Sequence, residues 1–452
     1  MRIIVAGSGK VGAALTRQFT EEGHAVTVID IQADFLENAM EKYDVISVQG
    51  NCASMPVLLQ AGVKESDLLV AVTNQDEVNL LCCTTAHCLN PKLHTIARVR
   101  NPDYNEQSYH MRDVFGLSML INPENQAAVE IYRLLKYPGF LRRDTFAKGR
   151  TKIVELRVDH GSKLRNVRLA DLRGIVNCQV LVCAVLREGT AMTPRGDFIL
   201  NEGDRIFVTA LSDNLTILLQ NLGMLTRKVK RVLLCGGSTV SYYLAKRLEK
   251  EGVQVKIVEK ELARCEELSA LLPNTDIIQG DISNQEILES EGLQRCDALV
   301  SCSKSDSLNM VVSLYASACG VPQVITRLGN ADNRSLIDSL PLGSVICPKD
   351  LCSMNIARYV RAMENQTGAA LSVHTIADGL AEAMEFRVDE HTHHCSEPLK
   401  QIRLKPNVLL VSITHGETSE IANGNSVFNL GDTVLVVTNG REILYQLNDI
   451  FA

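Results

Sequence analysis

The chain has 452 residues, of which 46% are hydrophobic and 22% are charged, and its net charge is −7 at pH 7. These values are ordinary for a globular protein of about three or four domains, and the acidic balance argues against a general affinity for the phosphates of nucleic acids. The longest apolar runs, such as 408–413, are far shorter than the ~20 residues that span a bilayer, and no secretory signal is recognisable, so we expect a cytoplasmic protein.

Residues 1–123 alternate short apolar stretches with helical ones. The apolar stretches are 3–6, 26–29, 45–48, 68–72 and 94–99. The segments between them, such as 13–22 and 76–89, place their apolar residues at helical spacing. Strands that alternate with helices form parallel sheets with right-handed crossovers, so the sequence predicts a doubly wound, Rossmann-like α/β domain.

The turn after the first predicted strand has the glycine pattern of a dinucleotide site. Gly7 permits the tight turn, Gly9 removes a Cβ that would block the phosphates, and Gly12 lets the next helix pack on the sheet. The N-terminus of that helix attracts the anion. Asp30 ends the second strand, where it would accept hydrogen bonds from an adenosine ribose and repel a 2′-phosphate, which favours NAD or an adenine nucleotide over NADP. The predicted binding residues here are Gly7, Ser8, Gly9, Lys10, Val11, Gly12 and Asp30.

Five later residues are predicted to close this site. Asn51 and Cys52 follow the third strand, near the expected adenine. Thr73 and Asn74 end the fourth strand, at the edge of the sheet where ligands bind. Arg98 ends the fifth strand, where it would pair with phosphates. A structural salt bridge is the alternative interpretation of Arg98 and of its counterpart in the second half, Arg327.

Residues 143–227 read as strands and turns that are closed by a helix. The predicted strands are 152–158, 179–186 and 205–210, and the predicted helix is 214–222. This pattern predicts a small α+β module, which is too short to be the substrate domain of an oxidoreductase.

The second half of the chain repeats the first. Gly7 and Gly236 are 229 positions apart, as are Asp30 and Glu259. The repeat predicts a second Rossmann-like domain and a second small α+β module, again closed by a helix. The predicted domain limits are 1–123, 143–227, 230–348 and 368–452. Two connecting helices, after Pro123 and Pro348, each have an apolar face that suits either contact with a partner domain or ordinary core burial.

The second glycine turn departs from the first. Ser238 and Ser241 stand where the middle and last glycines would be, while Glu259 keeps the ribose-type acid. A Cβ at Ser238 narrows the approach of a phosphate, although its hydroxyl is able to donate to one. An adenine mononucleotide therefore fits better than a dinucleotide, and a purely structural copy is the alternative. The predicted residues of this site are Gly237, Ser238, Thr239, Val240, Ser241, Glu259, Ser303, Lys304 and Arg327.

Patterns for metal binding and catalysis are weak. The segment 391–395 holds three histidines and a cysteine, which suit zinc, but no second ligand group accompanies it, so we predict no metal site. The 14 cysteines follow no disulfide spacing and are expected to be reduced and mostly buried. No GxSxG, HExxH or P-loop pattern occurs, and we predict no catalytic residues.

The chain resembles RCK (regulator of potassium conductance) proteins over essentially its whole length. The resemblance rests on the order of the four domains, on the Val-Ala-Gly-Ser-Gly-Lys-Val-Gly turn with Asp30, on the Gln-Gly-Asn at 49–51 and on the paired small modules. The resemblance implies a non-enzymatic regulator, of which four chains form a homotetrameric ring of eight RCK units under a membrane potassium channel or transporter of the Trk type. It implies NAD(H) and ADP/ATP as ligands, at the residues named above. It also implies a place on the inner face of the cell membrane, reached through the partner.

Two other classes of function are compatible with Rossmann-like domains. An NAD-dependent oxidoreductase needs a catalytic acid near the nicotinamide, and the sequence offers no candidate. A redox or NAD sensor that acts on DNA needs a basic recognition helix, and none stands out against the acidic balance. We therefore expect a nucleotide-sensing regulator without a nucleic-acid partner.

Overall fold

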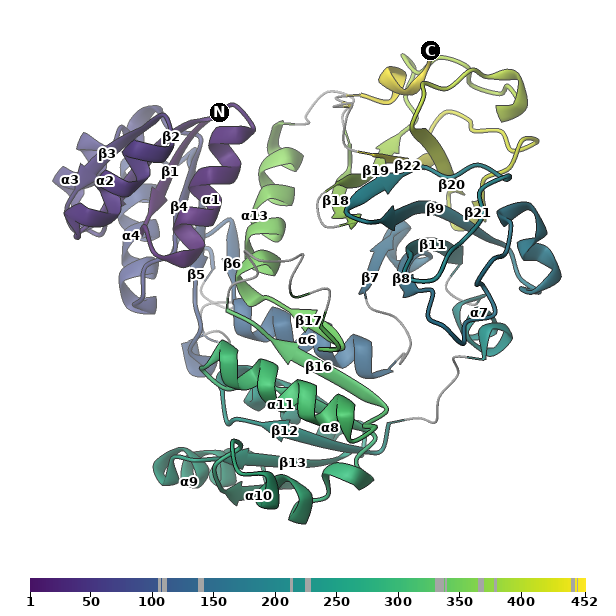
Figure 1. Ribbon diagram of the computed structural model, residues 1–452. Helices are drawn as coiled ribbons and strands as arrows, with labels where there is room; N and C mark the ends of the chain where they lie inside the picture. The colour runs from purple at the N-terminus through teal and green to yellow at the C-terminus, as the bar shows by residue number, and fades with distance from the viewer. Residues whose placement is uncertain are drawn as a thin grey trace.

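The computed structural model contains four sheets in two repeats (Figure 1). It describes residues 1–104, 107, 112–136, 142–211, 214–223, 229–329, 337, 340–364, 370–377, 380–439, 444 and 446–452. The predicted domain limits at 227 and 368 lie outside these residues. Within the described ranges, no helix has both the length and the apolar character that a membrane crossing requires.

The first sheet is parallel, in the order β3-β2-β1-β4-β5-β6. Its strands are β1 (Arg2–Ala6), β2 (Ala25–Asp30), β3 (Val45–Gln49), β4 (Leu68–Ala71), β5 (His94–Arg98) and β6 (Met119–Ile121). Its helices are α1 (Lys10–Glu21), α2 (Ala33–Lys42), α3 (Met55–Gln60) and α4 (Asp76–Leu89). Helices cover both faces, which explains why the central strands are continuous apolar runs and confirms the predicted doubly wound architecture.

The second sheet repeats this order as β14-β13-β12-β15-β16-β17. Its strands are β12 (Arg231–Cys235), β13 (Gln254–Glu259), β14 (Thr275–Gln279), β15 (Ala298–Ser301), β16 (Gln323–Arg327) and β17 (Ser344–Ile346). Its helices are α8 (Thr239–Lys250), α9 (Leu262–Leu271), α10 (Gln285–Ser290) and α11 (Asp306–Ala318). In both sheets the strand order reverses beside the first strand, and ligands of doubly wound folds bind at this point, outside the carboxyl ends of the strands.

The other two sheets are antiparallel and have five strands each. The first contains β7 (Arg142–Phe146), β8 (Thr151–Arg157), β9 (Val180–Arg187), β10 (Thr190–Met192) and β11 (Arg205–Leu211), and is followed by α7 (Asn214–Leu222). The second contains β18 (Ser372–Ile376), β19 (Ala381–Arg387), β20 (Val408–His415), β21 (Thr418–Ile421) and β22 (Thr433–Thr438). The predicted closing helix is present as α7. In the second module the described C-terminal residues form only a 3₁₀ turn at Leu447–Ile450, so the prediction of a helix is wrong for them.

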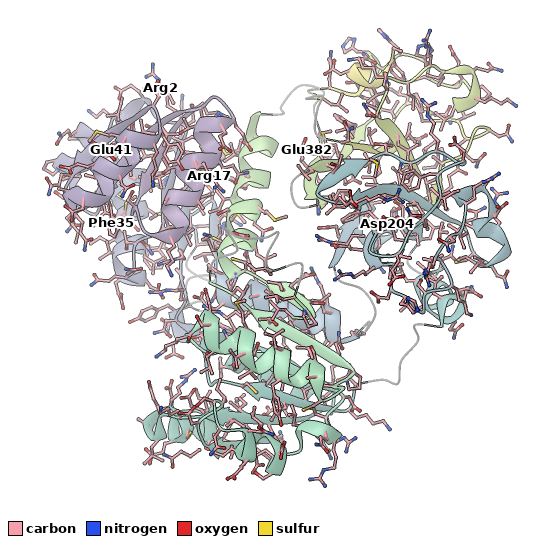
Figure 2. The ribbon with its side chains drawn as sticks, in the orientation of Figure 1. Arg2, Arg17, Phe35, Glu41, Asp204 and Glu382 are labelled. Carbon is pink, nitrogen blue, oxygen red and sulfur yellow. The ribbon has the colours of Figure 1, made fainter. Side chains whose placement is uncertain are left out.

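A Gly-Asp pair precedes one central strand in each small sheet. Gly203 has a φ of +89°, which turns the chain into β11. Asp204, labelled in Figure 2, is 1% exposed and accepts hydrogen bonds from Nε and Nη2 of Arg187, both at 2.7 Å. In the second sheet, Asp432 accepts a hydrogen bond from His415 at 2.7 Å. In both modules, the aspartate of the repeated pair therefore fixes the start of the central strand through a hydrogen bond to a neighbouring basic side chain.

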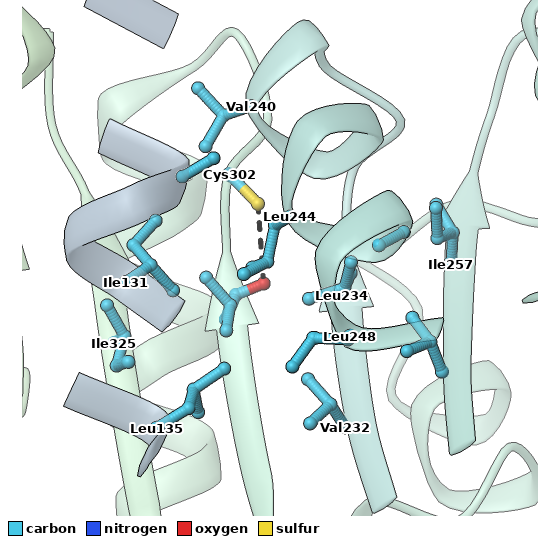
Figure 3. Close-up of a cluster of buried hydrophobic side chains, with 14 of the residues drawn as sticks. Ile131, Leu135, Val232, Leu234, Val240, Leu244, Leu248, Ile257, Cys302 and Ile325 are labelled. Carbon is cyan, nitrogen blue, oxygen red and sulfur yellow. Dashed lines mark hydrogen bonds between the residues drawn. The ribbon is translucent and has the colours of Figure 1, made fainter. Parts of the chain in front are cut away.

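The two connecting helices are exchanged between the halves of the chain. Helix α6 (Pro123–Lys136) follows the first sheet but packs against α8, and its apolar face completes the core of the second sheet (Figure 3). Helix α13 (Pro348–Glu364) follows the second sheet but lies beside α1 (Figure 1), where Cys352, Ile356 and Val360 are buried in the first core. The two interpretations of these apolar faces therefore hold together, because each face contacts the domain of the other half and is buried in that domain's core.

Candidate functional site

The fold brings the predicted residues of the first half to one edge of the sheet. The glycine turn follows β1, Asp30 ends β2, Thr73 follows β4 and Arg98 ends β5. Because parallel strands end at the same edge, residues far apart in the sequence become neighbours there. The order of the strands in the sheet, and not one sequence motif, therefore brings the residues of the candidate site together.

The structure requires a glycine at two of the three glycine positions of the first turn, but not at the third. Gly7 has a φ of +103°, and a Cβ on it would lie 2.8 Å from the backbone nitrogen of Thr73. A Cβ on Gly12 would lie 1.8 Å from the carbonyl oxygen of Gly7. Around a Cβ on Gly9, by contrast, there is no described atom within 4 Å. The fold itself requires Gly7 and Gly12, whereas Gly9 leaves open space in front of the helix.

This open space faces the N-terminus of α1. Gly9 is the N-cap residue, and no side chain accepts a hydrogen bond from the first turn there. Lys10, the first helical residue, is exposed, and Val11 is buried in the core of the first sheet. Unpaired N–H groups at a helix N-terminus attract anions, so the turn has the chemistry of a phosphate cradle.

The carboxylate of Asp30 closes back on the turn. Its Oδ2 accepts a hydrogen bond from the Ser8 N–H at 2.6 Å, and its Oδ1 accepts one from Gln32 at 3.0 Å. Asn51 is exposed near the same strand ends, and its Oδ1 accepts a hydrogen bond from Ala53. The acid and the amide thus lie at the same edge of the sheet as the glycine turn.

Cys52 is a predicted site residue whose side chain lies in the core of the sheet. Its side chain is 4% exposed and lies in the core beneath α4. A hydrogen bond from Cys82 lowers the pKa of the Cys52 thiol, and the same bond, together with burial, raises the pKa of Cys82. The thiol is therefore part of the packing behind the site.

Asn79 organises the strand ends, although the sequence analysis did not assign it to the site. Its Oδ1 accepts hydrogen bonds from N–H and Oγ1 of Thr73, both at 2.8 Å, and its Nδ2 donates to the carbonyl oxygens of Thr73 and Arg98. Asn309 makes the same four bonds to Ser303 and Arg327. The one signal in the sequence is that this asparagine recurs at the same place in both halves.

Arg98 is held against the end of β4. Its Nη2 donates to the carbonyl oxygen of Thr73 at 2.6 Å and lies 3.4 Å from Oδ1 of Asn74, while its buried Nε has no hydrogen-bond partner among the described residues. Burial, assisted by the neighbouring charge of Arg100, lowers the pKa of Arg98, and Glu124 opposes this effect. No carboxylate of the described residues lies within ion-pair distance of the Arg98 guanidinium. The described residues therefore do not form the salt bridge that was the alternative interpretation of Arg98.

The exchanged helix α13 completes this site from the other half of the chain. Val11 of the glycine turn and Val72 after β4 share one buried cluster with Cys352 and Ile356 of α13. In the second half, Val240 and Cys302 likewise pack with residues of α6. Each turn is therefore backed by a helix that belongs to the opposite repeat.

The second turn is closed by its own side chains. Oγ of Ser238 accepts a hydrogen bond from the Ser241 N–H at 3.4 Å and so caps α8. Oγ of Ser241 donates to the carbonyl oxygen of Gly236 at 2.5 Å and lies 3.2 Å from Sγ of Cys302. Glu259 accepts a hydrogen bond from Gly237 at 2.6 Å, as Asp30 does from Ser8. The cap that is absent from α1 is present on α8.

The remaining predicted residues of the second half reproduce the first. Nη1 of Arg327 donates to the carbonyl oxygen of Ser303 at 2.9 Å, as Arg98 does to Thr73. Thr239 begins α8, and Lys304 is exposed at the same edge of the sheet. The two halves thus position equivalent residues, with different side chains at the turn.

The expected adenine positions also differ. Ile31, the residue after Asp30, is 67% exposed. Its equivalent is Lys260, whose Nζ lies 2.8 Å from Oδ2 of Asp281, and Asp281 is the equivalent of Asn51. Bonds from Lys260 and Ser283 hold the pKa of Asp281 well below its usual range. In the second half, the ion pair of Lys260 and Asp281 therefore occupies the expected adenine position. In the first half, the apolar side chain of Ile31 and the amide of Asn51 lie at the equivalent positions.

The histidine-rich segment 391–395 forms local contacts. His394 pairs with Glu397 at 3.0 Å, and Sγ of Cys395 donates to the carbonyl oxygen of Thr392. Across the described part of the chain, no group of three or more His, Cys, Asp and Glu side chains is arranged to hold a metal ion.

Known proteins match the chain along its whole length. The model of the TrkA-N domain matches residues 3–123 and 232–348, and that of the TrkA-C domain matches residues 153–223. The chain is 28% identical to the Trk system potassium uptake protein TrkA of Vibrio alginolyticus, over 100% of this chain and 98% of the relative. It is 30% identical to a Trk system potassium uptake protein TrkA homolog of Archaeoglobus fulgidus, over 100% of both chains.

Solved structures share the fold at lower identity. The GsuK RCK domain has a TM-score of 0.64 and 14% identity, and the match covers 97% of this chain and 92% of that one. The GsuK channel bound to NAD has a TM-score of 0.63 and 15% identity, with 97% and 76% covered. These relatives are Trk system potassium uptake proteins, and these structural neighbours contain RCK domains. Two TrkA-N domains in series and full-length similarity to potassium uptake proteins show that this chain, a regulatory protein and not an enzyme, belongs to the TrkA family.

Proposed function

We propose that the protein is the cytoplasmic, nucleotide-sensing regulatory subunit of a Trk-type potassium uptake system. The observation that carries this proposal is the first glycine turn, where Gly9 leaves open space at the uncapped N-terminus of α1 and Asp30 lies beside it. Family membership supports the link to potassium uptake.

NAD(H), ADP and ATP are the proposed ligands of the first site. The glycine turn and Lys10 would hold the phosphates, Asp30 the ribose, and the surface of Ile31 and Asn51 the adenine. Arg98, a buried cation beside a second arginine, gains from a nearby anion. The solved GsuK channel structures with NAD and with ADP support this class of ligand.

The second site is proposed to bind an adenine nucleotide more weakly. Its helix already has a cap in Ser238, and the Lys260–Asp281 pair would have to open before an adenine could pack there. Because the pair is largely exposed, opening it costs little. The complete set of predicted residues in both halves stays part of this proposal, with Cys52 acting through packing.

Exchange of the connecting helices gives a mechanism for regulation. A ligand at one turn touches a cluster that includes a helix of the other half, so ligand binding and the arrangement of the halves are physically linked. A nucleotide shifts a conformational equilibrium only if it binds the two states with different affinity. A coupling of about 1–3 kcal/mol per site, summed over a symmetric ring, is enough to change the state of a gate.

We further propose that four chains form a ring of eight RCK units, peripheral on the inner face of the cell membrane through a Trk-type channel or transporter subunit. The TrkA relatives and the structural similarity to the GsuK channel support this arrangement. Each chain would contribute two RCK units to the ring, and each unit would consist of one Rossmann-like domain and the small module after it, with the domain limits predicted from the sequence.

Calorimetric titration tests the ligand assignment. NADH, NAD, ADP and ATP are titrated into the full-length wild type, Asp30→Ala and Glu259→Ala. We expect Asp30→Ala to lose the tighter binding event and Glu259→Ala to lose at most a weaker one. Wild-type affinities that survive both substitutions would contradict the site assignment. Small-angle scattering with each nucleotide tests the ring, and an identical profile in every state would contradict regulation by ring shape.

A further inference from the structure

Two equivalent residues of the repeat meet where the small modules touch. Strand β7 pairs with β8 so that Asp144 lies opposite Ile153, and β18 pairs with β19 so that His374 lies opposite Ala383. Both pairs of equivalents, Asp144 with His374 and Ile153 with Ala383, are 230 positions apart. The two residues therefore occupy the same place in two copies of one fold.

Their side chains are in direct contact and nearly buried. Nδ1 of His374 donates a hydrogen bond to Oδ1 of Asp144 at 3.0 Å, and the two side chains are 7% and 12% exposed. The ring of His374 lies 4.4 Å from the ring of Phe146, measured between centroids. Contact between a residue and its own equivalent places this pair on the pseudo-twofold axis that relates the modules.

The apolar part of the contact uses equivalent positions of the two modules. One buried cluster combines residues of both small sheets, and many of its members are equivalents of one another: Phe146 and Ile376, Ile153 and Ala383, Cys183 and Val411, Phe207 and Leu435. At three of these positions the first module has the larger side chain, so a pair of identical modules would be overpacked or would leave cavities there. Apolar packing therefore also favours the observed pair.

The polar part of the contact is not symmetric. Ala147 donates its N–H to Oε1 of Glu385 at 3.0 Å across the contact. The equivalent of Glu385 is Glu155, which accepts a hydrogen bond from Arg205 of its own sheet at 2.5 Å. The polar groups thus distinguish the two sides of the interface, as the sizes of the apolar side chains also do.

We infer that the Asp144–His374 pair selects the partner of each small module, so that the first module pairs with the second module of its own chain and not with an identical one. Pairing of two first modules would place Asp144 against Asp144, and two buried carboxylates at this distance repel each other. Pairing of two second modules would place His374 against His374 and remove the carboxylate acceptor. Specificity of this kind arises from the cost of the wrong partner as much as from the right contact.

Hydrogen exchange of full-length variants tests this inference. His374→Asp creates the Asp–Asp contact, Asp144→His creates the His–His contact, and the double variant restores a complementary pair in the opposite sense. We expect amide exchange in β7 and β18 to become at least tenfold faster in His374→Asp, and less so in Asp144→His. The double variant should recover most of the wild-type protection. His391→Asp, at an exposed position, is the matched control and should exchange at the wild-type rate in both strands.

The double variant decides the outcome. Recovery relative to His374→Asp supports the inference, including the case in which His374→Asp does not fold and the double variant does. Wild-type exchange in both single variants overturns it, and so does a double variant that exchanges or unfolds as readily as His374→Asp. The result does not depend on nucleotide binding, so it stands or falls separately from the proposed function.

Discussion

Tyr243 joins the two candidate sites through one side chain. Its hydroxyl accepts a hydrogen bond from Nδ2 of Asn122 at 3.0 Å and donates to the carbonyl oxygen of Arg100 at 3.3 Å. Tyr243 is the fifth residue of α8 and lies two residues after Ser241 of the second glycine turn, and Arg100 lies two residues after Arg98. The regions of the two candidate sites are therefore in direct contact through Tyr243.

Replacement of this tyrosine should change the response of stability to alkaline pH. Burial, with a contribution from Tyr242 and nearby carboxylates, raises the pKa of Tyr243 to about 12, against about 10 in an unfolded chain. The raised pKa means that this group's contribution is complete below pH ~10 and is lost as the pH rises towards 12. At pH 8, Tyr243→Phe should be less stable than the wild type by about 0.5–1.5 kcal/mol in urea unfolding, because it lacks the hydrogen bonds of the hydroxyl. Between pH 9 and 11.5, however, the free energy of unfolding should fall less in Tyr243→Phe than in the wild type. Parallel curves for the two proteins across this range would contradict the prediction, and Tyr43→Phe is the control.

Two alanine substitutions in the first turn should separate ligand binding from folding. Gly9→Ala places its Cβ in open space, so the free energy of unfolding should fall by no more than about 1 kcal/mol. Binding of NADH should nevertheless weaken at least tenfold, which is ~1.4 kcal/mol, because the methyl group occupies the approach to the phosphates. Gly12→Ala collides with the Gly7 carbonyl and should lose about 3 kcal/mol or more of stability. Urea unfolding and calorimetry measure both effects, and unchanged NADH affinity in Gly9→Ala would remove the turn from the binding site.

The second site should open when it is given the side chains of the first. Ser238→Gly removes the cap of α8, and Lys260→Ile replaces the exposed ion pair with the apolar residue of the first half. In an Asp30→Ala background, which isolates the second site, the double substitution should tighten ADP binding about tenfold or more. The reverse exchange, Ile31→Lys with Gly9→Ser in an otherwise wild-type chain, should weaken the first site. Loss of ADP binding in the opened variant would show that Ser238 and Lys260 are ligand contacts rather than obstacles.

Asn79 should be required for stability. It is fully buried and makes four hydrogen bonds to the ends of β4 and β5, so Asn79→Ala leaves several buried backbone groups without partners. We expect a loss of about 2–4 kcal/mol in urea unfolding. Asn74→Ala, at an exposed position of the same strand end, should change stability by less than about 0.5 kcal/mol. A near-neutral Asn79→Ala would mean that water replaces these bonds.

Local sequence patterns predicted the elements of the fold well. Apolar stretches predicted the five strands β1 to β5 of the first parallel sheet, and the residues 76–89 and 214–222 form the helices expected of them. The short edge strand β6 and the strands β7 and β10 of the first small module were not predicted. The small module at the C-terminus also differs from its prediction. Its predicted closing helix is a 3₁₀ turn in the described residues, where contacts of Leu447 and Ile450 with the module core determine the structure.

The sequence by itself determined the repeat, the doubly wound domains and the identity of the first glycine turn, because these depend on periodicity and on residues close together in the chain. Only the tertiary structure decided that α6 and α13 are exchanged, that Asn79 ties two strand ends, that Cys52 is buried behind the site and that Asp144 meets His374. An apolar helix face is compatible with any apolar surface, and a polar side chain with many partners. Which partner each one receives is fixed only when strands and helices distant in sequence pack together.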